Sequence, residues 1–259
     1  MTFEIIRGIL IPFFGTTLGS ACVLFMRRGI SDTLCRMLSG FAGGVMVAAS
    51  VWSLLIPSIE CASGLGAFSF VPAVCGLFLG VLLLLMLDKC IPHTHKNNQS
   101  EGPRSRLSKN ALMFFAITLH NVPEGVAIGV VYASLVSGSA DITLAEALAL
   151  SVGIAIQNFP EGAIVSMPLC EKNGKVKAFL YGVASGIVEP IATIITVLLA
   201  ELLLPVLPYL LSLAAGAMIF VVVEELIPEM TNGDHKADLG TIMFTLGFAI
   251  MMSLDVALG

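Results

Sequence analysis

The amino-acid sequence predicts an all-α, polytopic membrane protein that forms a single domain over residues 1–259. Of its residues, 57% are hydrophobic and only 12% are charged. Soluble domains carry about twice that charged fraction. The apolar residues stand in long continuous runs, which favour helices over the short alternating strands of a membrane barrel. Lipid must therefore be the solvent for most of the surface.

Eight apolar runs are each long enough to cross a bilayer as a helix, which takes about 20 residues. They cover residues 5–26, 35–58, 66–87, 111–135, 145–170, 176–200, 204–228 and 239–258. The first run has no basic segment before it and no cleavage site, so we expect a retained helix rather than a signal peptide. The third and fourth runs are joined by a long polar loop, residues 88–110. His93 and His95 in this loop could hold a metal loosely, although two incidental histidines in a solvated loop explain them as well.

The basic residues predict the orientation. The loops after the first, third, fifth and seventh runs hold twelve of the thirteen Lys and Arg residues, and the other three loops hold none. Because cytoplasmic loops carry the positive excess, we expect a protein of the plasma or inner membrane with both termini outside the cytoplasm. The basic residues are too thinly spread to indicate a nucleic-acid partner. The six scattered cysteines, without any CxxC, indicate packing residues.

Polar residues repeat within the fourth and fifth runs, as HNVPEG at residues 120–125 and QNFPEG at residues 157–162. Residues three and four apart share a helix face. The residues expected on two such faces are His120, Asn121 and Glu124, and Gln157, Asn158 and Glu161. With Glu189 of the sixth run they lie within roughly 6 Å of one level near the midplane, at about 1.5 Å per residue. A carboxylate there costs roughly 2.5–3.5 kcal/mol, so the group indicates an ion or substrate path.

The chemistry of this group favours a divalent cation. Oxygen ligands alone suit Ca²⁺ or Mg²⁺, and an added imidazole shifts the preference towards Zn²⁺, Fe²⁺, Mn²⁺ or Cd²⁺. Two other interpretations stay open: a hydrogen-bonded histidine between helices, and a proton relay of carboxylates and histidine.

The second and seventh runs resemble each other. LSGFAGGVMVAASVWSLLIPSIE (38–60) and LSLAAGAMIFVVVEELIPEM (211–230) both pass through a methionine, Met46 or Met218, and end in Leu-Ile-Pro and an acid. Because the two helices run in opposite directions, the likeness indicates an inverted repeat, which is typical of transporters. It places Ser53 and Glu60 at an outer mouth, and Glu224, Glu225 and Glu229 at an inner one. Glu60 and Glu229 could equally be ordinary interfacial residues.

At HNVPEG, QNFPEG and the VEP of residues 188–190, the chain resembles the ZIP (Zrt/Irt-like) family of divalent metal transporters, and Gln157 resembles its GufA-type branch. The resemblance covers nearly the whole chain and implies a two-metal centre bridged by the motif glutamates. One implied site comprises Met46, His120, Glu124, Gln157 and Glu161, and the other Asn121, Glu124, Asn158, Glu161 and Glu189. Asn158 departs from relatives with Asp there. Ser53 and Glu60 match the family's outer entrance, and Glu224 and Glu225 its cytoplasmic release route.

The resemblance implies transport of Zn²⁺, and of Cd²⁺, Fe²⁺ or Mn²⁺ as similar ions, into the cytoplasm by alternating access. The metal is then the substrate, without a catalytic cofactor, and the protein is no enzyme. The alternatives are a proton-coupled carrier of an organic solute and, further behind, an intramembrane metalloenzyme, against which the absence of HExxH speaks. Expected partners are divalent ions and the bilayer, and a homodimer is left open. The sequence does not rank the metals, fix their number or reveal the driving force.

Overall fold

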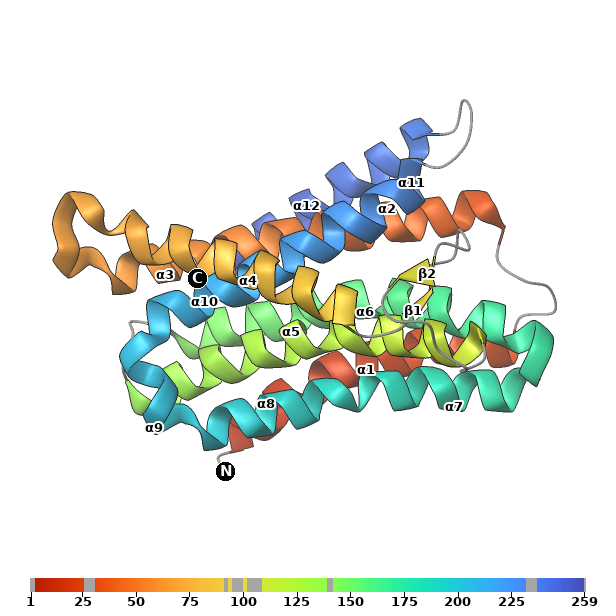
Figure 1. Cartoon of the computed structure of the whole chain (residues 1–259), viewed down its shortest axis with the longest axis horizontal. Helices are drawn as coiled ribbons and strands as arrows, with labels where there is room; N and C mark the ends of the chain where they lie inside the picture. The colour runs from red at the N-terminus through yellow and green to blue at the C-terminus, as the bar shows by residue number, and fades with distance from the viewer. Residues whose placement is uncertain are drawn as a thin grey trace.

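The computed structural model describes residues 3–25, 31–90, 93–94, 100–101, 109–138, 142–231 and 237–258. The described chain is almost entirely helical, and its long helices run along the long axis of the molecule (Figure 1). The α-helices are α1 (Phe3–Phe25), α2 (Asp32–Ala49), α3 (Ile56–Cys61), α4 (Phe70–Cys90), α5 (Lys109–Ser137), α6 (Leu144–Asn173), α7 (Lys175–Gly186), α8 (Val188–Leu198), α9 (Ala200–Leu203), α10 (Leu207–Val221), α11 (Ile227–Thr231) and α12 (Ala237–Leu258). The all-α class is confirmed.

Seven helical stretches of the described chain are long and apolar enough to cross a membrane. The apolar part of α5 that could be assessed, Asn121–Ser137, is shorter, so the eighth span stays a prediction. In the polar loop, β1 (His93–Thr94) pairs antiparallel with β2 (Ser100–Glu101). His95 lies outside the described residues.

Three predicted helices are less regular than their apolar runs suggest. The second and seventh contain π-helical segments, η1 (Ser50–Leu55) and η4 (Val222–Leu226), each followed by Ile-Pro. Proline has no N–H to donate, which favours a local change of hydrogen-bond register before it. The sixth run is interrupted at Ile187, between α7 and α8. The 3₁₀ segments η2 (Ser63–Phe68) and η3 (Leu204–Val206) complete the helical elements.

The paired π segments agree with the inverted repeat. Ile56 N–H bonds to the carbonyl of Val51, and Ile227 N–H bonds to that of Val222, five residues back in each case. Ser53 and Glu224 occupy equivalent positions, each four residues before the proline. Ser53 and Glu224, which the sequence predicts at the outer and inner mouths, therefore both lie in a π-helical segment before a proline.

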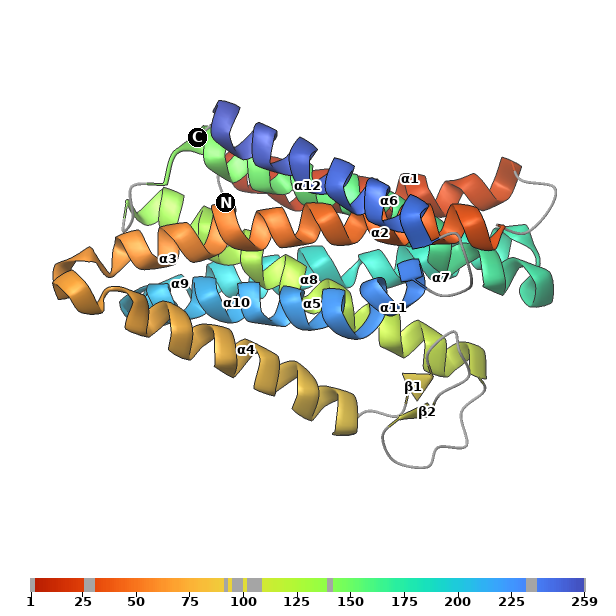
Figure 2. The ribbon, with the colours of Figure 1, turned by 90° about the horizontal axis from the view of Figure 1, so that it is seen from above.

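The helices form two groups, which Figure 1 shows as neighbouring layers and Figure 2 shows from above, with one group in front of the other. In one group α2 packs on α12 and α10 on α4, and in the other α1 packs on α6 and α5 on α8. Small residues allow close approach within each group. A Cβ at Gly44 would overlap the backbone of α12 at Phe244, and one at Gly15 would overlap that of α6 at Ala155. Contacts of α2 with α6 and of α10 with α5 join the groups.

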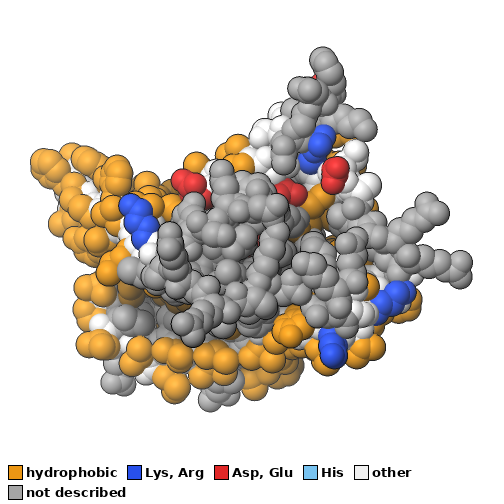
Figure 3. Space-filling model, turned by 45° about the vertical axis from the view of Figure 1, so that its right-hand side comes forward, with side chains coloured by type: hydrophobic (Ala, Val, Ile, Leu, Met, Phe, Trp, Pro, Cys, Tyr) orange, Lys and Arg blue, Asp and Glu red, His pale blue; other side chains and the backbone are white. Residues whose placement is uncertain are grey.

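The exterior suits a multi-pass membrane protein. Both termini lie at the end of the molecule that carries η2 and α9 (Figure 1). Lys89 at the end of α4 and Lys175 at the start of α7 belong to the opposite end. Figure 3 shows basic side chains around that end and hydrophobic side chains along the flank. Large apolar side chains such as Phe78, Leu202 and Ile242 are exposed, as expected of surfaces that face lipid.

Candidate metal centre

Three helices bring the predicted carboxylates together. Glu124 on α5 and Glu189 on α8 are buried, and Glu161 on α6 is half-buried. The three lie close enough for their charges to interact. The antiparallel pairing of α5 and α6 creates this group, because the two motifs lie at similar depths in helices that run in opposite directions.

Side-chain amides and one hydroxyl hold two of the carboxylates in place. Gln157 Nε2 donates to Glu124 Oε1 at 2.9 Å, and Asn158 Nδ2 donates to Glu189 Oε2 at 2.8 Å. Thr16 of α1 donates its hydroxyl to Glu189 Oε1 at 2.8 Å. Sequence reasoning missed Thr16, because a single hydroxyl in an apolar helix gives no pattern that singles it out.

Three buried oxygens, one on Glu124 and one on each of two α6 amides, accept no hydrogen bond from the described residues. They are Glu124 Oε2, Gln157 Oε1 and Asn158 Oδ1. Buried polar atoms are almost always hydrogen-bonded, so each exception needs an explanation. All three are hydrogen-bond acceptors: one lies on α5, and the other two belong to consecutive residues of α6. A single cation can satisfy several such acceptors at once.

Hydrogen bonds to the backbone hold α5 against α7 and α8. Asn121 Nδ2 donates to the carbonyl of Ser185 at 3.0 Å. The Thr193 hydroxyl donates at 2.9 Å to the carbonyls of both Gly125 and Glu189. A Cβ at Gly125 would overlap the backbone at Glu189, so the glycine of HNVPEG permits the close approach that brings Glu124 to Glu189.

Two predicted ligands are less defined. His120 lies on α5, but its side chain is outside the described part of the structure. Met46 is fully buried on α2, in the apolar cluster that also contains Ile128 and Ile154. Among the described residues there is no group of three or more His, Cys, Asp and Glu side chains already arranged to hold a metal. Amides from α6 form part of the centre instead.

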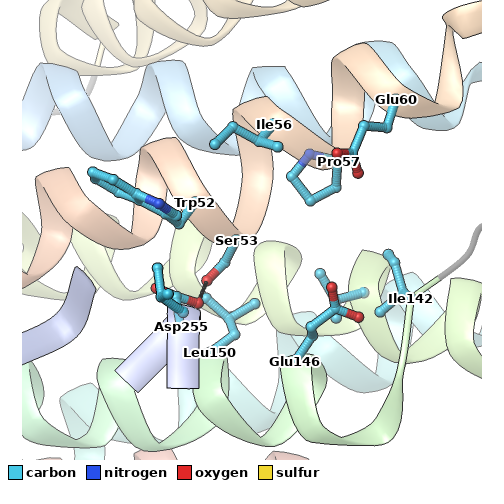
Figure 4. Close-up of a pocket in the computed structure, with 11 residues that line it drawn as sticks. Trp52, Ser53, Ile56, Pro57, Glu60, Ile142, Glu146, Leu150 and Asp255 are labelled. Atoms are coloured by element: carbon cyan, nitrogen blue, oxygen red, sulfur yellow. Dashed lines mark hydrogen bonds between the residues drawn. The ribbon is translucent and has the colours of Figure 1, made fainter. Parts of the chain in front are cut away.

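A pocket of about 270 Å³ lies between η1, α3, α6 and α12 (Figure 4). Ser53 and Glu60 line it, as do Glu146 of α6 and Asp255 of α12. Ser53 Oγ donates to Asp255 Oδ1 at 2.6 Å, and the carboxylates of Glu60 and Glu146 point into the space between their helices (Figure 4). Asp255 Oδ2 is buried and has no partner in the described chain.

The sequence reasoning missed Glu146 and Asp255. Asp255 is the single acid of the eighth apolar run, and an isolated acid in an apolar helix could have indicated a functional role. In the sequence, Glu146 is explained by a role in capping the start of a helix. It does accept a hydrogen bond from the Thr143 N–H at 2.6 Å in a capping box. Only the packing of α6 and α12 near η1 brings both carboxylates to this pocket.

The inner acids lie on the other π segment. Glu224 is exposed and Glu225 is half-buried, both within η4. Glu229 on α11 accepts from Cys35 Sγ of α2 at 2.9 Å.

Comparison with known proteins places this chain among metal transporters. The family model described as ZIP Zinc transporter matches residues 105–255. The human zinc transporter ZIP11 is 34% identical, over 99% of this chain and 98% of its own length. The zinc transporter ZIPB of Bordetella bronchiseptica is 40% identical, over 95% and 79% of the two chains. The zinc transporter GufA of Myxococcus xanthus is 33% identical, over 80% and 81%.

Proposed function

Because this chain belongs to the ZIP family of zinc transporters, we propose that it moves Zn²⁺ and similar divalent ions into the cytoplasm, with Glu124 and Glu161 as central ligands. The observation that carries this proposal is that buried oxygens of Glu124 on α5 and of Gln157 on α6 have no hydrogen-bond donor among the described residues. Members of the family are transporters and not enzymes. The hypothesis of an intramembrane metalloenzyme therefore loses its support.

The donor set suits a borderline ion. An ion between Glu124 and Glu161 gains the oxygens of Glu124 and Gln157 that have no donor among the described residues. Met46 and His120 complete the proposed ligand set, and thioether with imidazole favours Zn²⁺, Cd²⁺ or Fe²⁺ over Mg²⁺ and Ca²⁺.

The route proposed for the ion begins at the outer pocket. Its carboxylates attract cations, and Ser53 with Asp255 forms one wall. Leu150 lies at this pocket and Ile154, one turn further along α6, is fully buried. At about 1.5 Å per residue, Leu150 is roughly 10 Å from Gln157 along the helix. We infer that Leu150 and Ile154 separate the pocket from the centre, which makes this a conformation closed on the pocket side.

The division of the residues between the two helix groups supports a mechanism of alternating access. Glu124, Glu161 and Glu189 all belong to the group of α1, α5, α6 and α7–α8. Met46 and most of the outer pocket belong to α2, η1, α3 and α12. A shift of one group against the other would open the pocket side and then the side of Glu224 and Glu225. We place both termini outside the cytoplasm, in the plasma or inner membrane, and a homodimer is compatible with this arrangement.

Metal flux into proteoliposomes tests the proposal. We expect Glu124→Gln combined with Glu161→Gln to abolish saturable zinc uptake, while Asp238→Asn, at an exposed carboxylate of α12, leaves it unchanged. Competition by Cd²⁺, Fe²⁺ and Mn²⁺ at two pH values ranks the ions and reveals proton coupling. Saturable uptake that persists in the double variant contradicts the central site. Uptake of an organic solute without competition by divalent ions would favour the proton-coupled carrier.

A further inference from the structure

The residues that the family resemblance assigns to a second metal site are engaged in hydrogen bonds between helices. Asn121 donates to the carbonyl of Ser185, which joins α5 to α7. Both carboxylate oxygens of Glu189 accept hydrogen bonds at 2.8 Å, one from Thr16 of α1 and one from Asn158 of α6. Each of these donors is neutral. We call these bonds the brace: one links α5 to α7, and the other two link α1 and α6 to α8.

The first site differs in this respect. Glu124 Oε2 and Gln157 Oε1 are buried and accept no hydrogen bond from the part of the chain that is described. An ion that binds to them satisfies acceptors that otherwise lack a partner. At the second site only Asn158 Oδ1 lacks a donor among the described residues, and an ion that binds Glu189 would compete with the hydrogen bonds that both of its oxygens already accept, so the gain in free energy is smaller.

The amide of Asn158 faces Glu189, which the resemblance assigns to the second site. Its nitrogen donates to Glu189, and the same amide is close enough to Glu124 to interact with that carboxylate. An amide nitrogen carries two hydrogens and can serve two acceptors. An aspartate at residue 158 has no such hydrogens and adds a negative charge. With aspartate at residue 158, two carboxylates would face each other and would need a cation between them. Asparagine instead presents the positive end of an N–H dipole to Glu189.

The net charge of the centre also favours one bound ion over two. Glu124, Glu161 and Glu189 carry three negative charges when ionised. One divalent ion leaves a single negative charge, which Glu189 can hold because two donors already face it. Two divalent ions leave a net positive charge in a buried region without a further carboxylate to receive it, and an uncompensated buried charge is costly.

We propose that the centre of this chain binds one divalent ion, between Glu124 and Glu161, and that Thr16, Asn158 and Glu189 form a hydrogen-bonded unit in the place of a second ion. Glu189 is then no ligand, and Thr16 and Asn158 are positioning residues that fix it. This inference rests on the proposed function and specifies how many ions the site carries.

The number of bound ions in the purified full-length protein tests the inference. Zinc is measured after loading and removal of loose metal, and the count for Glu124→Gln with Glu161→Gln is subtracted as the background from other sites. We expect a difference of one, and an X-ray absorption spectrum without a zinc–zinc distance of about 3.5–4 Å, the spacing of two-metal sites. A difference of two, or a zinc–zinc distance, overturns the inference and leaves the proposed function intact. A difference of zero refutes the proposed function itself.

Two single variants test the part played by the brace. Glu189→Gln should retain the one central ion, whereas the matched variant Glu124→Gln should lose it; loss of the ion in Glu189→Gln makes Glu189 a ligand and overturns the inference. Asn158→Asp removes the amide hydrogens that face Glu189 and adds a carboxylate, so the count should rise to two. A count that stays at one in a folded Asn158→Asp protein overturns the role of the amide. If this variant does not fold, the count in the unaltered chain and in Glu189→Gln still decides.

Discussion

The replacement Glu124→Gln should make the metal-free protein more stable and remove its stabilisation by zinc. Glu124 is fully buried, and one of its oxygens accepts from Gln157 while the other has no partner in the described structure. Glutamine has the same shape, and its carbonyl oxygen can keep the bond from Gln157. Its NH₂ group takes the place of the unpartnered oxygen and can donate to Gln157 Oε1 or Asn158 Oδ1, which also lack donors.

The size of the effect follows from these atoms. Each unsatisfied buried polar group costs about 1–3 kcal/mol, and the replacement removes one such acceptor and supplies a donor to another. We therefore expect the metal-free variant to gain about 2 kcal/mol or more in its free energy of unfolding. Zinc at a hundredfold excess over its Kd stabilises a folded protein by about 2.7 kcal/mol. The unaltered chain should gain that amount, and the variant should gain almost none of it.

The assay is unfolding in detergent or nanodiscs, with a chelator and with zinc, for the unaltered chain and for Glu124→Gln. The reasoning is refuted if the metal-free variant unfolds more readily than the unaltered chain. It is also refuted if zinc stabilises both proteins equally, because Glu124 would then contribute nothing to the metal site.

Three further replacements test other parts of the structure. Thr193→Val removes the hydroxyl that bonds to the carbonyl of Gly125 and should cost about 0.5–1.5 kcal/mol of unfolding free energy, with Thr193→Ser close to the unaltered chain. Gly125→Ala introduces a Cβ that overlaps the backbone of α8, so it should cost about 1–3 kcal/mol, whereas Gly64→Ala, where the described structure leaves open space, should have little effect on thermal unfolding. Asp255→Asn should raise the KM for zinc uptake several-fold with a smaller change in maximal rate, since Asp255 lines the outer pocket rather than the centre; an unchanged KM in flux assays would remove it from the route.

Much of the fold could be predicted because a bilayer restricts what a chain can do. Continuous apolar runs must be helices there, and lengths near 20 residues fix their approximate ends. The irregular parts escaped prediction, since a run such as 204–228 looks uniformly apolar although η4 lies within it. The register change before Pro57 and Pro228 depends on local hydrogen bonds that composition does not reveal. The interruption at Ile187 escaped for the same reason.

The sequence by itself determined which groups are buried and at what depth. The repeated Pro-Glu-Gly motifs place Glu124 and Glu161 near one level, because a helix advances by a constant rise per residue. Tertiary structure alone decided which of their atoms have partners. That Thr16 of α1 reaches Glu189, that Asn158 turns its amide nitrogen towards the same carboxylate, and that Asp255 meets Ser53 across the molecule all depend on contacts between distant segments. Spacing along one helix defines a face and a height, but the orientation of an amide and the partner of an oxygen are set by the helices packed against it.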